Sequence, residues 1–273
     1  MDKYYARLVS RVLSIEKSRK RGKNMWQIYD DLINEIPEDL TVLECMIGTS
    51  WTLVRSQKGI GIAMTVKGGR RKGSELSNIS GMQLKKLAAY SKSWNMLEAS
   101  LGMAAINAAF NNPSQVMDIT GEPMVKSDNP EKYNGFKALE PNMAGKKVAV
   151  IGHFPDIEKF NEICELSILE REPQAGDYPD PACEYLLPEQ DFVFITGAAF
   201  INRTMPRLIQ LSKKAQIVLV GPSVPVSKIL FKYGVNFIAS FVVIEQQLTW
   251  KAVQEGKKMN IFKAGGEMVC INP

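Results

Sequence analysis

His153 is the single histidine of the chain, and it directly follows a short apolar run that ends on Gly152. Because an imidazole titrates near neutral pH, a histidine in this position could act as a general acid or base, or as a ligand. The other interpretation is a ring that only caps the turn through hydrogen bonds, and the sequence does not choose between the two. A single histidine does exclude metal sites that need several histidines.

Two further apolar runs end on glycine in the same way. Continuous apolar runs bounded by turn residues are typical of strands buried on both faces of a parallel sheet. The carboxyl ends of such strands share one edge of the sheet, where small ligands bind. We therefore expect a ligand-binding crevice there, lined by Gly152, His153, Thr196, Gly197, Gly221 and Ser223.

Two carboxylates are candidates for the same crevice. Glu170 lies 18 residues beyond Gly152, at the end of the next predicted strand. It is our candidate catalytic partner for His153 if the protein is an enzyme. Asp177 lies in the proline-rich segment 173–182, which we predict to be an irregular loop, and loops at this edge of a sheet commonly carry function.

Asn202 and Thr204 lie near the start of a predicted helix, whose free N–H groups could receive an anionic group. Ordinary helix capping by the same side chains is the alternative. A dinucleotide cofactor is not expected, because Phe154 and Pro155 follow Gly152 where the phosphate-binding turn needs further glycines. The cofactor therefore stays unknown, with a divalent metal ion or a metal chelate as the open alternatives.

The first half of the chain predicts helices at 4–21, 25–36 and 83–91, and an antiparallel meander of strands at 41–47, 51–56 and 59–65. Asn95 is a predicted N-cap that forms a capping box with Glu98, at the start of an apolar helix rich in small residues. Asn107 inside that helix predicts a buried side chain bonded to a backbone group.

The second half alternates strands and helices from Gly145 onward, which predicts a Rossmann-like parallel-sheet domain. The predicted strands are at about 147–152, 167–171, 191–197, 216–221 and 236–243, and the predicted helices at about 156–164, 198–213, 225–233 and 245–255. Residues 113–144 contain four prolines and predict a linker or an irregular surface. The fold class is therefore α/β, with an α+β domain at 1–140, including a helical extension at 1–24, and a parallel-sheet domain at 141–273.

Composition narrows the class of protein. Apolar residues make up 45% of the chain and charged residues 23%, with a net charge of +5, which is ordinary for a globular protein. The four cysteines are dispersed and no apolar stretch is long enough to span a membrane. We expect a cytoplasmic protein with reduced thiols and neither nucleic acid nor membrane as a partner; a homo-oligomer is compatible with the sequence.

Several segments together resemble a known family. They are 44–55, 93–108, 150–155, 196–204 and 220–225. The family has no established function, is labelled "putative heavy-metal chelation", and joins an enolase-N-terminal-like domain to a Rossmann-like domain. The resemblance begins at about Met25. It implies a site between the two domains, lined by Asn95 and Glu98 on one side and by Gly152, His153, Glu170, Thr196 and Gly221 on the other.

Three hypotheses follow. The leading one is a protein that binds a metal chelate, or its organic precursor, in the cleft between the domains. The second is an enzyme that acts on such a ligand, with His153 as acid–base and Glu170 as its partner. The third is an interaction protein whose basic N-terminal helix is the binding surface.

Overall fold

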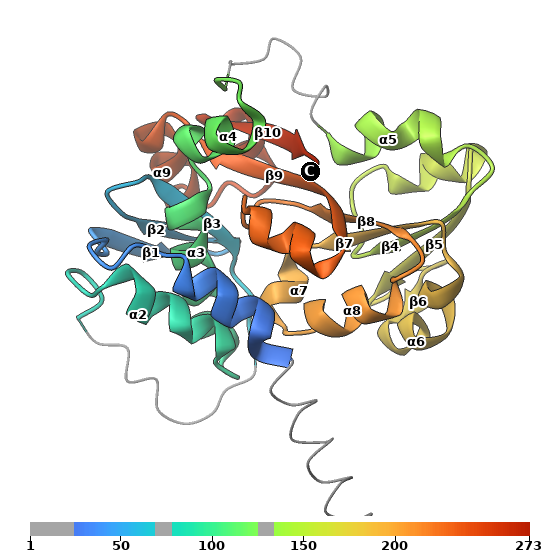
Figure 1. The fold of residues 1–273 in the computed structure, drawn as a ribbon, viewed down its shortest axis with the longest axis horizontal. Helices are drawn as coiled ribbons and strands as arrows, with labels where there is room; N and C mark the ends of the chain where they lie inside the picture. The colour runs from blue at the N-terminus through green and yellow to red at the C-terminus, as the bar shows by residue number, and fades with distance from the viewer. Residues whose placement is uncertain (1–24, 69–77, 125–133) are drawn as a thin grey trace, which may run out of the picture.

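The computed structural model describes residues 25–68, 78–124 and 134–273, so the predicted helix at 4–21 and the extension at 1–24 lie outside the described residues. A three-stranded antiparallel sheet is followed along the chain by a seven-stranded, mostly parallel sheet covered by helices (Figure 1). The predicted fold class, an α+β part followed by a parallel-sheet part, is confirmed.

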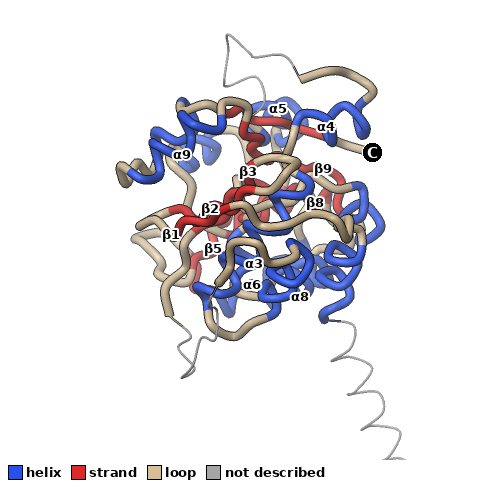
Figure 2. The backbone as a smooth tube through the Cα atoms, turned by 90° about the vertical axis from the view of Figure 1, so that its left-hand side faces the viewer, coloured by secondary structure: helices blue, strands red, loops and turns tan. Residues whose placement is uncertain are grey.

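The small sheet is the predicted meander. Its strands are β1 (Glu44–Ile47), β2 (Trp51–Arg55) and β3 (Ile60–Met64), paired in that order. Successive side chains alternate between its faces. Leu53 and Ile62 join Val253 on one face, whereas Val54 and Ala63 pack toward helix α3 (Met96–Phe110) on the other. Figure 2 shows α9 and α3 on opposite sides of these strands, so both faces of the small sheet are covered.

Helix α3 lies directly on strand β3 because both carry small residues at the contact. A Cβ atom at Gly61 would lie 2.0 Å from the carbonyl oxygen of Ala104, so no larger residue fits without moving the helix. The helix is buried all round, as its apolar sequence requires.

The large sheet has the strand order β10-β9-β8-β7-β4-β5-β6, and every neighbouring pair is parallel except β9 and β10. Its strands are β4 (Lys147–Ile151), β5 (Glu165–Glu170), β6 (Tyr178–Pro179), β7 (Phe192–Thr196), β8 (Gln216–Val220), β9 (Val235–Val243) and β10 (Gly266–Ile271). The five predicted strands are confirmed, and β6 and β10 at the two edges were not predicted. Because β4 pairs with β5 on one side and β7 on the other, the winding of the sheet reverses between β4 and β7.

Helices cover both faces of the large sheet (Figure 1). The helices and 3-10 turns, besides α3, are residues 25–34, α2 (Leu84–Ala88), η1 (Ala89–Lys92), α4 (Pro113–Thr120), α5 (Gly135–Met143), η2 (Ile157–Glu162), η3 (Asp180–Ala182), α6 (Cys183–Leu186), η4 (Leu187–Glu189), α7 (Ala198–Ile201), α8 (Met205–Leu211), η5 (Lys228–Tyr233), α9 (Gln246–Gln254) and η6 (Met259–Lys263). On one face, Phe136 of α5 stacks on Phe194 with ring centroids 4.6 Å apart. On the other, Leu208 of α8 packs into the core together with Ile195.

Several predictions about helical or irregular segments were wrong, among them the helix predicted at 225–233, which is the 3-10 turn η5. Residues 113–144 are not irregular throughout: Pro113 opens α4, where its missing N–H costs no hydrogen bond, and α5 accommodates Pro141. The helix predicted at 156–164 is the 3-10 turn η2. The helix predicted at 198–213 is divided into α7 and α8.

Two buried asparagines, one within α3 and one at its C-cap, hold the helix on the large sheet. Asn107 donates from Nδ2 to the carbonyl oxygens of Ile62 at 2.7 Å and Pro222 at 3.1 Å, so the predicted bond to backbone is confirmed. Asn111 donates to the carbonyl oxygen of Val224 at 3.0 Å. The carboxyl end of β8 therefore lies against the small sheet and α3. The domain boundary near residue 140 stays a prediction, and that position lies within α5.

Among the residues described, no helix combines the length and the apolar character needed to cross a bilayer.

Candidate functional site

The ends of β4 and β7 meet at the point where the winding of the sheet reverses. Gly152 follows β4 with a φ of +103°, a conformation that favours glycine, and it turns the chain beside β7. A Cβ atom at Gly152 would lie 3.2 Å from Cβ of Thr196. These two predicted site residues are therefore neighbours, and His153 is the next residue of the chain.

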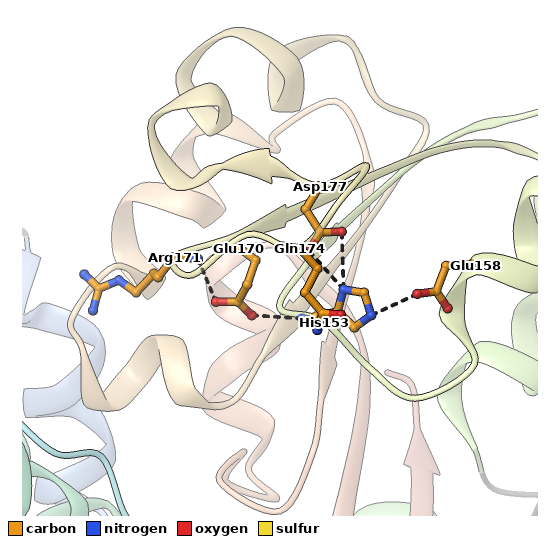
Figure 3. A network of polar contacts seen from close by, with 6 residues as sticks. All are labelled: His153, Glu158, Glu170, Arg171, Gln174 and Asp177. Atoms are coloured by element: carbon orange, nitrogen blue, oxygen red, sulfur yellow. Dashed lines mark hydrogen bonds and ion pairs between the residues drawn. The ribbon is translucent and has the colours of Figure 1, made fainter.

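The imidazole of His153 lies between two carboxylates (Figure 3). Its Nδ1 is 3.0 Å from Oδ2 of Asp177, and its Nε2 is 2.9 Å from Oε1 of Glu158. The Asp177 side chain is only 2% exposed and also accepts a hydrogen bond from the N–H of Gln174, whereas the Glu158 side chain is 55% exposed. Asp177 is thus a fixed partner of the ring, and Glu158 is a partner that solvent or a ligand can displace.

The same neighbours change the protonation of His153. The hydrogen bond with Asp177 is the largest cause that raises the pKa of His153 above its ordinary value, and the charges of Asp177 and Glu158 raise it further, against the opposing effect of burial. The protonated form of the His153 imidazole is therefore favoured here more than in an unperturbed histidine.

The Glu170 carboxylate contacts the backbone of His153 and not its ring, and its catalytic role stays a prediction. The carboxylate accepts hydrogen bonds from the backbone N–H groups of His153 at 2.9 Å and Arg171 at 2.6 Å. The reason is the register of the sheet, in which Leu169 lies opposite Ile151, so Glu170 meets the backbone that continues from β4. The two bonds close the turn that carries the histidine.

Glu158 was not predicted. It lies five residues after His153, and helical periodicity places residues at that spacing on different faces. The turn at Asp156, with a φ of +57°, reverses the chain so that η2 brings Glu158 back to the ring. The sequence signal that could have found Glu158 is an acidic residue that follows a histidine and a turn containing proline.

The second group of predicted residues lies at the start of α3. Asn95 is the predicted N-cap and accepts the N–H of Leu97 at 3.1 Å. The predicted capping box was wrong, because Glu98 accepts a hydrogen bond from the hydroxyl of Ser93, and the N–H of Asn95 also donates to that hydroxyl at 3.1 Å. Ser93 takes the place that the Glu98 side chain has in a capping box.

Arg203 joins the two parts of the protein at this point, and the sequence did not single it out as a site residue. It lies between α7 and α8, yet its Nη1 donates to the carbonyl oxygen of Ser93 and its guanidinium lies 4.5 Å from the ring centroid of Trp94. Burial is the largest cause that lowers the pKa of Arg203; the interaction with Tyr29 raises it, and the nearby charge of Arg171 lowers it. Arg171, the residue after Glu170, therefore lies within electrostatic range of Arg203.

The remaining predicted residues have packing contacts or local hydrogen bonds. Asn202, the C-cap residue of α7, accepts hydrogen bonds from the N–H and the hydroxyl of Thr204 at 3.0 and 2.7 Å, and Thr204, the N-cap residue of α8, makes no side-chain capping bond, so helix capping by these side chains is not seen. Ser223 is buried and accepts the N–H of Met64 at 2.8 Å. A Cβ atom at Gly197 would lie 2.9 Å from Cβ of Ser223, so these two residues form the packed junction of the sheets. Gly221 is half-buried with a φ of +109°.

A hollow of about 590 Å³ lies elsewhere, between the helix at 25–34, α2 and η5. Its wall includes an ion pair, Lys85 with Glu38 at 2.6 Å, and none of the predicted site residues. We keep the region of His153 as the candidate site, because it lies at the ends of β4 and β7, where the winding of the sheet reverses.

The donor set of the described residues does not fit a bare metal ion. No three histidine, cysteine, aspartate or glutamate side chains of this part of the chain come together so that they could hold one. The two nitrogens of His153 face carboxylates on different sides of the ring, so these donors do not converge. The four cysteines are free thiols, and burial raises the pKa of each, to about 12 for Cys183.

Fold and site define a class of protein in which a small antiparallel sheet and its helix α3 are docked on the carboxyl edge of a doubly wound sheet. Two family models, DUF4213 and DUF364, match residues 29–110 and 134–272, and both are described as "putative heavy-metal chelation". The chain belongs to this family.

Relatives share nearly the whole chain. An uncharacterized protein of Methanocaldococcus jannaschii is 30% identical over an alignment of 272 residues. The alignment covers 93% of this chain and 95% of the relative. A crystal structure of a DUF364-family protein of unknown function from Desulfitobacterium hafniense has a TM-score of 0.83 at 39% identity, over 92% of this chain and all of the other. A DUF364-family structure from Pyrococcus horikoshii, at 23% identity and a TM-score of 0.74 over the same shares, has the same fold.

Proposed function

We propose that this protein handles heavy metals as chelates, and that it binds a small polar metal–chelator complex where the carboxyl edge of β4 and β7 approaches the start of α3. The family description suggests heavy-metal chelation, without a ligand. The position at the reversal of the sheet supports this location, since ligands of doubly wound sheets bind there.

One observation carries the choice of a chelate over a bare ion. The described residues contain no converging set of metal-ligating side chains, whereas the junction offers two guanidinium groups, the indole of Trp94 and the imidazole of His153. Such groups recognise the anionic and apolar periphery of an organic molecule and leave most of the coordination of the metal to that molecule.

Isothermal titration calorimetry with Ni²⁺ and Co²⁺, each as the free ion and as the citrate complex, tests this proposal. We expect saturable binding of a citrate complex and weaker binding of the free ion. Tighter binding of the free ion would refute the chelate form, and the absence of binding by all four probes would count against metal handling as a whole.

A matched pair of tryptophan variants tests the location. Trp94 and Trp250 each have an arginine stacked on the ring, Arg203 at 4.5 Å and Arg55 at 5.0 Å, but only Trp94 lies at the junction. We expect Trp94→Ala to weaken binding of the citrate complex and Trp250→Ala to leave it unchanged. Equal effects of both variants would place the ligand elsewhere.

A second candidate function is catalysis on the chelator with His153 as general acid–base. The observation in its favour is the fixed Asp177–His153 pair, which orients the ring and leaves Nε2 facing an exposed carboxylate. Under this hypothesis His153→Gln abolishes turnover of a bound chelator, followed by mass spectrometry, and leaves its affinity nearly unchanged. Loss of affinity with no turnover in the wild type would support binding alone.

A further inference from the structure

Arg203 is a buried cation whose guanidinium has no carboxylate partner among the described residues. The residue is 5% exposed. Its Nη1 donates to the carbonyl oxygen of Ser93, its Nη2 lies 3.2 Å from the sulfur of Met96, and its buried Nε–H has no acceptor. A thioether is a weak acceptor, so two of the three guanidinium nitrogens lack a strong hydrogen bond.

This arrangement is unfavourable in itself. A charge removed from water is stabilised only when hydrogen bonds and an opposite charge replace the solvent. The neighbouring charge is instead of the same sign, since Arg171 lies close enough to act on Arg203. The backbone of Arg203 is also held at a φ of +67°, a conformation that a non-glycine residue adopts only when its surroundings impose it.

Arg207, four residues further along the same chain, shows what the Arg203 group lacks. Arg207 donates from Nε to Oε1 of Glu184 at 2.8 Å and from Nη2 to Oε2 of the same carboxylate. The Nε and Nη2 donors lie along one edge of a guanidinium, and their spacing matches the two oxygens of a carboxylate. In Arg203 the same two donors face only the sulfur of Met96 and no acceptor.

We propose that the Nε–Nη2 edge of Arg203 binds a carboxylate group of the ligand, with Arg171 as a second cationic contact. This inference rests on the proposed function and names the chemistry that the site recognises. Met96 is half-buried and has a flexible side chain, so it can move aside for a carboxylate oxygen.

The surroundings indicate a ligand with at least two carboxylates. The Arg171 side chain is 49% exposed, and its contact with Asp180 is long, at 3.7 Å, so it is available to a second anionic group. Figure 3 shows Arg171 directed away from His153. The indole of Trp94 is 49% exposed and offers an apolar surface beside Arg203. A polycarboxylate chelator combines these features.

Calorimetry with acetate, succinate, citrate and inorganic phosphate, without metal, tests the inference on the full chain. We expect affinity to rise from acetate to citrate in the wild type, and phosphate to bind more weakly than citrate. Arg203→Lys keeps the charge but removes the two-donor edge, and should weaken citrate binding at least tenfold. Arg207→Lys, which changes the same kind of edge at a site already paired with Glu184, should leave it unchanged.

Arg171→Gln provides a second variant at an exposed side chain, in case Arg203→Lys fails to fold as judged by circular dichroism. We expect it to weaken citrate binding several-fold and acetate binding less. Wild-type affinity for citrate in both the folded Arg203→Lys and Arg171→Gln proteins would overturn the inference, as would tighter binding of phosphate than citrate.

The outcomes also separate this inference from the proposed function. Binding of metal–citrate that does not depend on Arg203 or Arg171 refutes the inference and leaves chelate handling standing. Binding of citrate that depends on both arginines, with no effect of added Ni²⁺ or Co²⁺, supports the carboxylate site and counts against metal handling. Failure of every carboxylate probe to bind the wild type refutes the inference.

Discussion

Replacing Asp177 with asparagine removes the charge that fixes the His153 ring and changes little else. The Asp177 side chain is 2% exposed and accepts hydrogen bonds from Nδ1 of His153 and from the N–H of Gln174. Asparagine has nearly the same shape and keeps one oxygen that can accept the Gln174 bond. The substitution therefore isolates the interaction between the carboxylate and the imidazole.

The expected loss of stability depends on pH. A hydrogen bond between charged groups stabilises by about 1.5–3 kcal/mol and a neutral one by about 0.5–1.5 kcal/mol, so the variant loses about 1–1.5 kcal/mol when His153 is protonated. Because the folded pKa of His153 is raised, this contribution is fully present below the ordinary value of 6.5 and is lost as the pH rises through the folded value. The wild type and the variant should differ most on the acidic side of pH 6.5.

The single histidine makes the measurement direct. In a protein without a histidine tag, the C–H signals of a single imidazole ring titrate in the NMR spectrum. We expect its midpoint to lie above 6.5 in the wild type, to fall clearly in Asp177→Asn, and to fall less in the control Glu158→Gln, since the Glu158 side chain is 55% exposed and screened by solvent. Urea unfolding at pH 6 and pH 8 measures the stability difference.

Two results would refute the reasoning. One is an unchanged midpoint in Asp177→Asn, which would mean that the carboxylate does not hold the ring in solution. The other is a larger fall in Glu158→Gln than in Asp177→Asn, which would make the exposed carboxylate the main partner of the imidazole.

Two further substitutions test the junction between the sheets by urea unfolding. Gly61→Ala places a Cβ atom 2.0 Å from the carbonyl oxygen of Ala104, and we expect a loss of about 3 kcal/mol; a loss below about 1 kcal/mol would show that α3 shifts easily. Asn111→Ala leaves the buried N–H of Val226 without its acceptor and removes three donated bonds, for an expected loss of about 2–4 kcal/mol. The neighbouring N-cap variant Asn112→Ala should cost only about 1 kcal/mol, and an equal loss in both would argue against a special role of Asn111.

Regular patterns made most of the fold predictable from the sequence. The central strands β4, β7 and β8 are continuous apolar runs, and their burial on both faces follows from that pattern. The edge strands were missed for physical reasons. Strand β6 has two residues, one of them a proline, and β10 pairs antiparallel to its neighbour, so neither has the long apolar run of a central parallel strand.

Only those residues of the candidate site that lie next to strand ends could be predicted from the sequence. His153 follows the end of β4. Asp177 directly precedes β6, which pairs with β5 at the edge of the sheet, so both positions follow from the order of the strands. Glu158 and Arg203 depend on left-handed backbone at Asp156 and at Arg203 itself. Non-glycine residues rarely adopt that conformation, and no periodicity indicates it. Contacts made through such turns cannot be derived from spacing.

The charges of the site also give the proposed ligand a direction. Two carboxylates contact His153 at one end, whereas at the other Arg203 lies on Trp94 and the charge of Arg171 acts on Arg203. An anionic group is attracted to the arginine end and repelled by the carboxylates, so the opposite end of a bound chelate faces the imidazole. Under the proposed function, substitutions at the arginine end therefore change affinity, and substitutions at His153 change the step that follows binding, if there is one. Separate measurement of affinity and turnover in the two sets of variants distinguishes a chelate carrier from an enzyme that acts on the chelator.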